Sequence, residues 1–253
     1  MATIPKLKPC VIRIRLMLVV TTMLTTASAN SEQRFIYKHI SDTATLQKGM
    51  HELDYHFWLE DWDRQGWNIK VIRNELTYRH GLSKRTELGI NQMHSSLMYW
   101  YGDYYWGTRS GFNDLQLYAK HQFLKEPDLP VTFSLGGKLF APTGSYEGFS
   151  SEKWGAGGFL AISKNVGSWR FAGHFGRIIY DESHWQDHNY WGVGALEKKY
   201  GFNLEIFGAN SSLQGLIGLT HQHSDGYVQY GLAIPMTNSN MKWRFIFGLG
   251  TYF

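Results

Sequence analysis

The sequence predicts an all-β chain that closes into an antiparallel transmembrane β-barrel of about 12 strands behind an N-terminal signal peptide. From residue 50 onward, stretches in which polar and apolar residues alternate are separated by turn-forming residues. Aromatic residues make up 16% of the chain and only 6 residues are proline, a composition that favours strands. No stretch beyond residue 30 stays apolar for the roughly 20 residues that a membrane helix needs. The pattern is therefore typical of a chain that crosses a membrane with strands.

The first 29 residues have the three-part layout of a secretory signal peptide. Basic residues between Lys6 and Arg15 precede an apolar run from Leu16 to Leu24, and small residues follow it. The apolar run is about ten residues long, which is too short to span a bilayer as a helix. We predict cleavage after Ala29, so that residues 1–29 are the signal peptide and the mature chain is exported.

Charge and cysteine content exclude several classes of function. Four of the 25 Lys and Arg residues lie before the cleavage point, which leaves 21 of them, equal to the 21 Asp and Glu residues. A mature chain without net positive charge is not expected to bind nucleic acid. The only cysteine, Cys10, is removed as well, which excludes a disulfide, a thiolate metal site and a cysteine nucleophile. We expect no cofactor.

The predicted strands show a period of two. Between Leu53 and Leu59 every odd-numbered residue is apolar, whereas Glu52, Asp54 and His56 occupy even positions. Most of the strands are close to the roughly 9–11 residues that cross a bilayer at a tilt. The predicted barrel domain is 50–253, with strands at 50–60, 68–79, 86–96, 112–124, 131–141, 155–164, 169–180, 190–199, 202–209, 215–223, 227–236 and 242–253.

Charged residues support this register. Lys120, Lys138 and Arg244 fall on the polar faces of their strands, as expected because a cation facing lipid at mid-depth costs about 2–4 kcal/mol. Arg177 shares a face with phenylalanines, but it lies near the loop end of its strand. We interpret Arg177 as a solvated charge at the rim, with contact to a lipopolysaccharide phosphate as the alternative.

The connections alternate between tight turns and longer segments. Short turns on one side and long loops on the other are typical of outer-membrane barrels. An even number of strands places both termini on the short-turn side, which is the periplasm. The longer segments are rich in Tyr, Trp, Gly, Ser and Asn and lie at 61–67, 97–111, 142–154, 181–189, 210–214 and 237–241.

The inward-facing positions define the candidate lumen. Its acidic and basic residues nearly balance, so it could pass small polar or zwitterionic solutes, or close itself through internal ion pairs. Residues 30–49 are polar without a clear period; we expect a periplasmic lead-in, with a short plug that enters the lumen as the alternative. The predicted lumen-lining residues are Glu52, Asp54, Arg73, Glu75, Arg79, Glu87, Asp114, Lys120, Lys138, Arg170, His174, Glu205 and Arg244.

Three segments at predicted strand boundaries carry a resemblance to a known family. They are the turn and strand start at 81–89, the strand start at 112–120, and the strand end from Lys138 through Pro142-Thr143-Gly144. Their order and spacing are similar to those of the outer-membrane transporters of the phenol meta-pathway type, over residues 48–253. Asn113 stands where that family has Gly. The resemblance implies the barrel fold and export or uptake of aromatic compounds.

The C-terminus resembles the signal that outer-membrane barrels present for assembly. The chain ends on Phe253, and apolar residues alternate before it. This resemblance implies the barrel-assembly machinery, outer-membrane lipids and lipopolysaccharide as partners, and the outer membrane of a Gram-negative bacterium as the location. The solute is not indicated.

The sequence favours a passive channel for small solutes over an enzyme, and the family resemblance implies aromatic solutes. One alternative is a lipid hydrolase, because His94 and Ser96 have the spacing that a strand-borne nucleophile and base require. A second alternative is a structural or surface-binding barrel that uses the aromatic residues of 97–111. His184 and His188 lie with acidic residues in one long loop, which we interpret as solvated, and we expect no metal site.

Overall fold

The computed structural model describes residues 43–124, 130–145, 149–181, 187–209, 212–237 and 239–253. The predicted signal peptide and most of the predicted lead-in lie outside these residues. The described residues form thirteen strands: β1 (His51–Arg64), β2 (Trp67–Gly81), β3 (Thr86–Tyr101), β4 (Tyr104–Phe112), β5 (Leu115–Leu124), β6 (Thr132–Ala141), β7 (Gly155–Val166), β8 (Trp169–Tyr180), β9 (His188–Glu197), β10 (Phe202–Ala209), β11 (Ser212–His223), β12 (Gly226–Pro235) and β13 (Met241–Tyr252).

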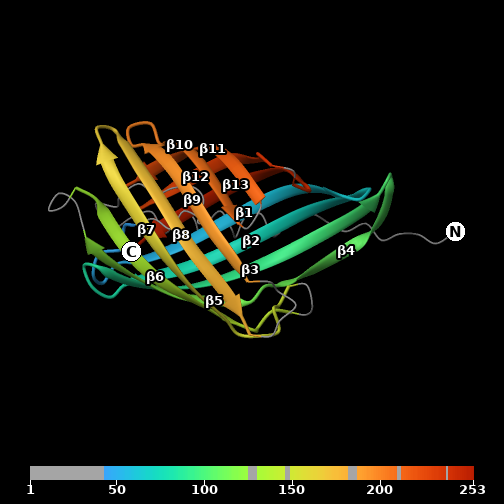
Figure 1. Cartoon of the computed structure of the whole chain (residues 1–253), viewed down its shortest axis with the longest axis horizontal. Helices are drawn as coiled ribbons and strands as arrows, with labels where there is room; N and C mark the ends of the chain where they lie inside the picture. Colours follow the sequence, from blue (N-terminus) through green and yellow to red (C-terminus); the bar gives the residue numbers. More distant parts are fainter. Residues whose placement is uncertain (1–42, 125–129, 146–148, 182–186, 210–211, 238) are drawn as a thin grey trace, which may run out of the picture.

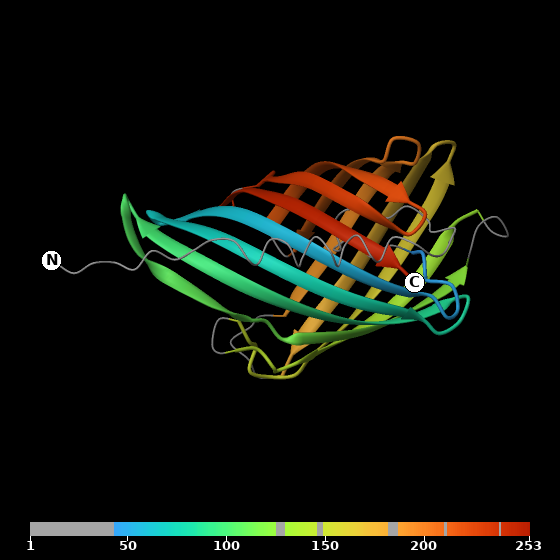
Figure 2. The ribbon, with the colours of Figure 1, turned by 180° about the vertical axis from the view of Figure 1, so that it is seen from behind.

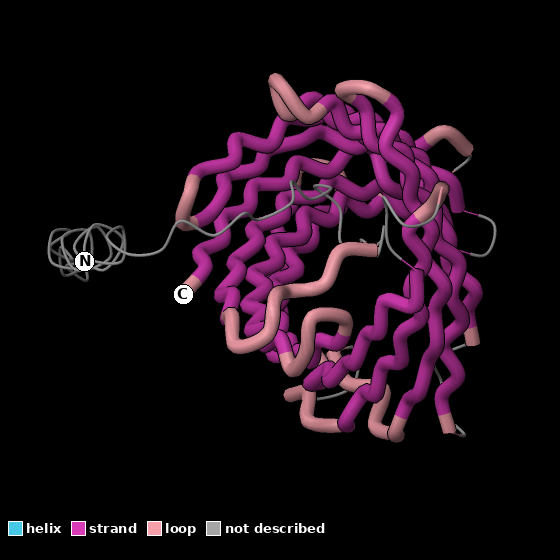
Figure 3. The backbone as a smooth tube through the Cα atoms, turned by 90° about the vertical axis from the view of Figure 1, so that its left-hand side faces the viewer, coloured by secondary structure: helices cyan, strands magenta, loops and turns pink. Residues whose placement is uncertain are grey.

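The strands close into one antiparallel barrel (Figures 1 and 3). Each strand from β5 to β13 pairs with the next, β13 pairs with β1, and β1 pairs with β2, which pairs with β3. At the seam, the backbone N–H groups of His51 and Phe253 each donate to the other residue's carbonyl, at 2.8 and 3.1 Å. The pairing of β13 with β1 and of β2 with β3 closes the ring, as a strand-built membrane protein requires where it meets lipid, whereas β4 pairs with β3 alone among the described residues.

Two strands share the fourth position in the ring, and the predicted strand at 112–124 covers β5 and only the last residue of β4. β4 pairs with residues 94–101 of β3, and β5 pairs with residues 86–91 of the same strand. The chain leaves the ladder between them at Asn113 and Asp114. Because β4 and β5 together take one place in the ring, the ring has twelve strand positions. The predicted all-β closed barrel of about 12 strands is therefore confirmed.

Side chains alternate between the two faces of the wall. In β1, the even-numbered residues from Glu52 to Glu60 are buried, whereas the odd-numbered residues from Leu53 to Leu59 are half-buried. In a closed barrel the buried face is the interior, and the other face meets lipid. Many large apolar side chains are exposed on that outer face, among them Leu88, Leu117, Leu139, Leu160, Phe175, Val193, Ile217 and Leu232. Among the described residues, no helix is long and apolar enough to cross a membrane.

Two of the predicted loops are instead parts of long hairpins, so those predictions were wrong. β1 and β2 continue through residues 61–67 to a two-residue turn, in which Gln65 and Gly66 have φ of 53° and 84°. Positive φ at both central residues is the geometry of a type I′ hairpin turn. Residues 97–111 form the ends of β3 and β4, because their Tyr and Trp side chains favour strands as strongly as loops. Both hairpins extend beyond the barrel at the end away from the C-terminus (Figures 1 and 2).

Candidate channel lumen

The thirteen predicted lumen residues all lie away from the lipid-facing surface. Arg73 and Lys138 are half-buried and the other eleven are buried. Five of them come together in two clusters of ion pairs along the barrel interior, and His174 and Lys138 meet in an aromatic cluster described below. Asp114 has a different place, since it lies in the break between β4 and β5.

The first charged cluster spans the closing seam. Arg79 of β2 lies between two carboxylates of β1, with its Nη2 2.5 Å from Asp54 Oδ2 and its Nη1 3.4 Å from Glu52 Oε2. The hydroxyl of Tyr227 on β12 donates to Asp54 Oδ1 at 2.6 Å and to Glu52 Oε1 at 3.1 Å. His56 Nδ1 lies 3.4 Å from Asp54 Oδ1. Both carboxylates have no solvent exposure, and the guanidinium of Arg79 and the phenol of Tyr227 help to compensate these two buried acids.

A second charged cluster lies nearer the outer end of the same strands. Glu60 Oε1 is 2.8 Å from Arg244 Nε and 3.4 Å from Arg73 Nε. Trp62 Nε1 donates to Glu60 Oε2 at 2.8 Å. The guanidinium of Arg244 also lies over the ring of Trp58, 5.5 Å from its centroid. Glu60 thus links β1, β2 and β13 across the interior.

Residues 43–46, which we call the inner segment, lie inside the barrel rather than beneath it. The carbonyl oxygen of Thr43 accepts hydrogen bonds from Ser134 Oγ at 2.7 Å and from Gln122 Nε2 at 3.2 Å. The Thr43 hydroxyl accepts one from Arg170 Nη2 at 3.0 Å. These partners come from β5, β6 and β8, so the wall holds the segment from several sides. A loop inside the ring is visible in the view along the barrel (Figure 3).

A second set of contacts holds the rest of the inner segment. Lys120 Nζ donates to the carbonyl of Ala44 and lies 3.0 Å from Glu87 Oε1. The backbone N–H of Leu46 donates to Glu87 Oε2 at 2.8 Å. Two residues predicted to line the lumen therefore bind the chain that precedes the first strand.

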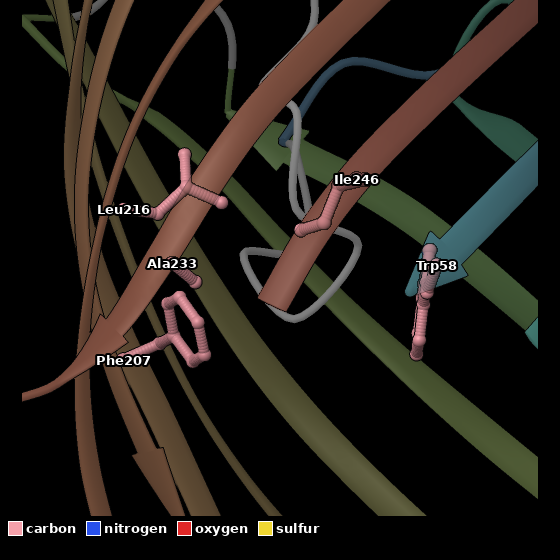
Figure 4. Packing of buried hydrophobic residues seen from close by; sticks show 5 residues of the cluster. All are labelled: Trp58, Phe207, Leu216, Ala233 and Ile246. Atoms are coloured by element: carbon pink, nitrogen blue, oxygen red, sulfur yellow. The ribbon is translucent and has the colours of Figure 1, made fainter. Parts of the chain in front are cut away.

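The interior also carries apolar side chains that the sequence analysis missed. Trp58 is the next inward-facing residue after His56 on β1, and Ile246 is the next after Arg244 on β13. The alternation that places the charged residues inside therefore also places these apolar residues inside. Five buried residues pack as one cluster, with Met93 against it, and we call this cluster the apolar belt (Figure 4). Its members are Trp58, Phe207, Leu216, Ala233 and Ile246. A second interior cluster contains Phe140, Phe159, Ile178 and Tyr190.

The outer loop at 142–154 is fastened to the wall by Asp114. One carboxylate oxygen accepts from Gly144 N at 3.0 Å and Ser150 Oγ at 2.7 Å, and the other from the N–H and hydroxyl of Ser151 at 2.7 and 2.6 Å. The neighbouring Thr143 hydroxyl accepts from Leu115 N at 3.0 Å. Thr143 and Gly144 of the Pro142-Thr143-Gly144 motif therefore take part in this anchor. Asp114, which was predicted to line the lumen, binds the loop through these hydrogen bonds.

Loss of the Asp114 carboxylate is expected to release this loop. Asp114→Ala removes four hydrogen bonds to a charged acceptor and should speed tryptic cleavage after the exposed Lys153 by at least about tenfold. Cleavage of the folded protein in lipid vesicles, followed by mass spectrometry, measures this. The matched control is Asp103→Ala, at the exposed tip of the β3–β4 hairpin, which should leave the rate unchanged. Equal cleavage in both variants would contradict the anchor.

The same anchor is expected to persist in moderately acidic solution. Burial raises the pKa of Asp114, but hydrogen bonds from Ser151 and Ser150 lower it more, so the pKa lies below its usual 3.8. A carboxyl with a depressed pKa stabilises the folded state above its unfolded pKa, and this stabilisation is lost as pH falls through the folded pKa. Amide exchange at Ser151, corrected for the intrinsic rate, should stay slow at neutral pH and accelerate only below pH 3.8. Acceleration already near neutral pH would contradict the prediction.

His94 and Ser96 lie on the outward face of β3, away from the interior. The ring of His94 packs edge-on against Phe112, with centroids 5.1 Å apart. Asn74 lies opposite His94 in the β2–β3 register, but its side-chain oxygen accepts a hydrogen bond from Tyr55. In the described part of the chain, no hydrogen bond joins His94 to Ser96 or to an orienting group, although a serine nucleophile needs both.

Comparison with known proteins finds a likeness of fold. No protein-family model matches the chain, and no curated protein matches its sequence. The COG4313 outer membrane channel from Pseudomonas putida F1 superimposes with a TM-score of 0.67 at 15% identity, covering 84% of this chain and 98% of that one. The KdgM porin superimposes with a TM-score of 0.55 at 12% identity, covering 80% and 99%. At such identities the likeness concerns the fold.

The fold and its lipid-facing surface define the class of protein. The chain is a closed antiparallel β-barrel with an apolar outer face, and the two solved structures that it resembles in fold are described as an outer membrane channel and a porin. The large apolar side chains exposed on that outer face suit contact with membrane lipid.

Proposed function

We propose that the chain is a passive channel that lets small solutes cross the outer membrane. The observation that carries this proposal is the interior of the closed barrel, where paired charges and two apolar clusters line the inner wall. The predicted lumen-lining residues form the polar part of this path. Because acids are paired with bases, we expect weak selection between small cations and anions.

The apolar part of the path favours solutes with an apolar or aromatic portion. The apolar belt and the cluster around Phe140 give such solutes surfaces to contact inside an otherwise polar wall. The resemblance to transporters of the phenol meta-pathway type points to the same class of solute. We therefore propose small aromatic compounds as cargo, moving down their gradient.

The inner segment serves in this proposal as a short plug that narrows the path. It lies in the half of the barrel nearest the C-terminus, where Lys120, Ser134 and Arg170 hold it. In this proposal small solutes pass beside the inner segment and large ones are excluded. For residues 30–49 the sequence analysis expected a periplasmic lead-in, with a plug that enters the lumen as the alternative. The contacts of residues 43–46 favour the plug at those positions.

Reconstitution tests the channel. The purified full chain in planar bilayers should give stepwise conductance, and liposome swelling with sugars, amino acids and small aromatic acids should rank its solutes. A phospholipid-hydrolysis assay on the same preparation should detect no activity. Complete absence of both conductance and swelling, with the barrel shown to be folded by its heat-modifiable migration, would contradict the proposal.

Contacts with envelope partners are part of the same proposal. Arg177 is 60% exposed near the outer end of β8 and lies 3.5 Å from Asp187, a position at which it can reach a lipopolysaccharide phosphate. Phe253 is exposed beside the seam and stacks on His51, with centroids 5.4 Å apart. An exposed terminal aromatic residue on the last strand suits recognition by the barrel-assembly machinery.

The β3–β4 hairpin raises the alternative of a surface-binding barrel. Tyr104, Tyr105 and Trp106 are exposed at its end, and the hairpin extends away from the ring instead of covering it (Figures 1 and 2). Exposed aromatic rings can bind sugars by stacking. Deletion of residues 102–110 is expected to leave the single-channel conductance unchanged, because the hairpin does not cover the barrel mouth. A large rise in conductance would identify a lid instead.

A further inference from the structure

We propose that the cluster around Lys138, His174 and Tyr190 is a binding site for an aromatic carboxylate. This inference deepens the proposed channel function and rests on it, since the site would hold cargo within the path. The three residues come from β6, β8 and β9, and all face the interior. They combine one cation, two further polar groups and an apolar wall.

The side chains of Lys138, His174 and Tyr190 are close neighbours. Lys138 Nζ is 5.1 Å from the ring centroid of Tyr190 and 5.6 Å from that of Phe159. The ring of His174 is 5.6 Å from the ring of Tyr190. Lys138 is half-buried, so part of its side chain is accessible. A single small ligand could therefore contact all three side chains.

Two of these side chains are buried with polar atoms that no described residue satisfies. His174 is 6% exposed and Tyr190 is 4% exposed. Within the described part of the chain, the two ring nitrogens of His174 have no hydrogen-bond partner, and the hydroxyl of Tyr190 has none either. Buried groups of this kind are costly unless something pairs with them. A carboxylate accepts hydrogen bonds through two oxygens, and it could pair with the Tyr190 hydroxyl, an imidazole N–H and the Lys138 ammonium together.

The surroundings select a flat apolar body for the ligand. Phe140, Phe159 and Ile178 are buried beside Tyr190 in the same cluster. The aromatic rings lie flat along the wall, because a Cβ at Gly136 would come within 2.1 Å of the Phe159 ring, and one at Gly176 within 2.3 Å of the Tyr190 ring. Glycine at both positions keeps the rings out of the lumen and leaves their faces to the interior. An aromatic ring carrying one carboxylate, such as benzoate, matches this arrangement.

Binding of three probes to the purified full chain tests the site. Benzoate has the ring and the charge, benzyl alcohol has the ring without the charge, and acetate has the charge without the ring. Equilibrium dialysis should give the tightest binding for benzoate. Lys138→Met should weaken benzoate binding by at least about tenfold and Tyr190→Phe by about fivefold, since each removes one hydrogen bond to a charged group. Binding of benzyl alcohol should change less than about twofold in Lys138→Met.

Matched variants separate the site from general effects. Lys242→Met removes an exposed ammonium near the outer rim, and Tyr230→Phe removes a lipid-facing phenol that contacts His221. Both should bind benzoate like the unchanged chain. Heat-modifiable migration shows that each variant is folded, and Tyr190→Phe keeps the shape of the ring if Lys138→Met does not fold.

The outcomes distinguish the site from the channel. Benzoate affinity that is equal in the unchanged chain, Lys138→Met and Tyr190→Phe would overturn the site, and so would acetate binding as tightly as benzoate. Ion conductance in potassium chloride is measured on the same preparations. A chain that conducts but does not bind benzoate overturns the inference and leaves the channel; a chain that binds benzoate with the expected variant pattern but never conducts supports the site and contradicts the channel.

Discussion

Removal of the inner segment is expected to raise the single-channel conductance at least about twofold, because one extended chain takes up a large share of the interior of a twelve-stranded barrel. The variant is a mature chain that begins at Gln47 directly after the signal peptide. It lacks the carbonyls of Thr43 and Ala44, to which Ser134, Gln122 and Lys120 donate. The freed wall groups would be hydrated, so the path should become both wider and more polar. Planar-bilayer recording measures the change.

Milder changes should give a graded response. Ser134→Ala and Gln122→Ala together remove two hydrogen bonds to the Thr43 carbonyl without changing any charge. We expect more frequent transitions between conductance levels as the inner segment detaches. The matched control is Thr220→Ala, which also changes a buried interior hydroxyl but one that contacts Asn203 instead. Unchanged conductance in the shortened chain would contradict the plug and leave the inner segment as a structural brace.

The register of the barrel could be predicted from sequence because lipid imposes a severe penalty on misplaced charge. Glu52 and Arg244 were assigned to the inner face by alternation alone, and both are buried there. The pattern fails where the strands leave the membrane. Tyr104, Tyr105 and Trp106 are consecutive and exposed, so β4 shows no alternation and was predicted to be part of a loop. Outside the lipid, β4 is held by backbone pairing with β3. Backbone pairing does not require alternating polar and apolar side chains, so the sequence of β4 does not reveal the strand.

The sequence analysis missed the inner segment and the apolar belt for different reasons. The wall binds backbone carbonyls of Thr43 and Ala44, a group that every residue has, so no motif marks the segment. Trp58 lies between Phe57 and Leu59, and an apolar residue on the inner face is hidden when both neighbours are apolar. Partners across the seam, such as Tyr227 and Asp54, require the register of three strands at once. Alternation gives the face of a residue but not its contacts.

Replacement of Arg79 is expected to destabilise the barrel more than any other single charge change considered for this chain. Arg79→Met leaves Glu52 and Asp54 buried without their guanidinium, and removal of one partner from a buried ion pair typically costs about 3–5 kcal/mol. The free energy of unfolding in lipid vesicles, from urea titration followed by tryptophan fluorescence, measures the loss. The control is Arg177→Met, whose partner Asp187 is 40% exposed, so the expected loss is about 0–1 kcal/mol.

Neutralising the acids should restore most of the stability lost with Arg79. In the triple variant Arg79→Met, Glu52→Gln and Asp54→Asn, no unpaired charge is left at the seam, and the Tyr227 hydroxyl can still donate to both amide oxygens. Recovery would show that uncompensated charge, rather than lost packing of the arginine stem, causes the destabilisation. A loss below about 1 kcal/mol in Arg79→Met itself would contradict the prediction, because it would mean that lumen water solvates these carboxylates as well as the guanidinium does.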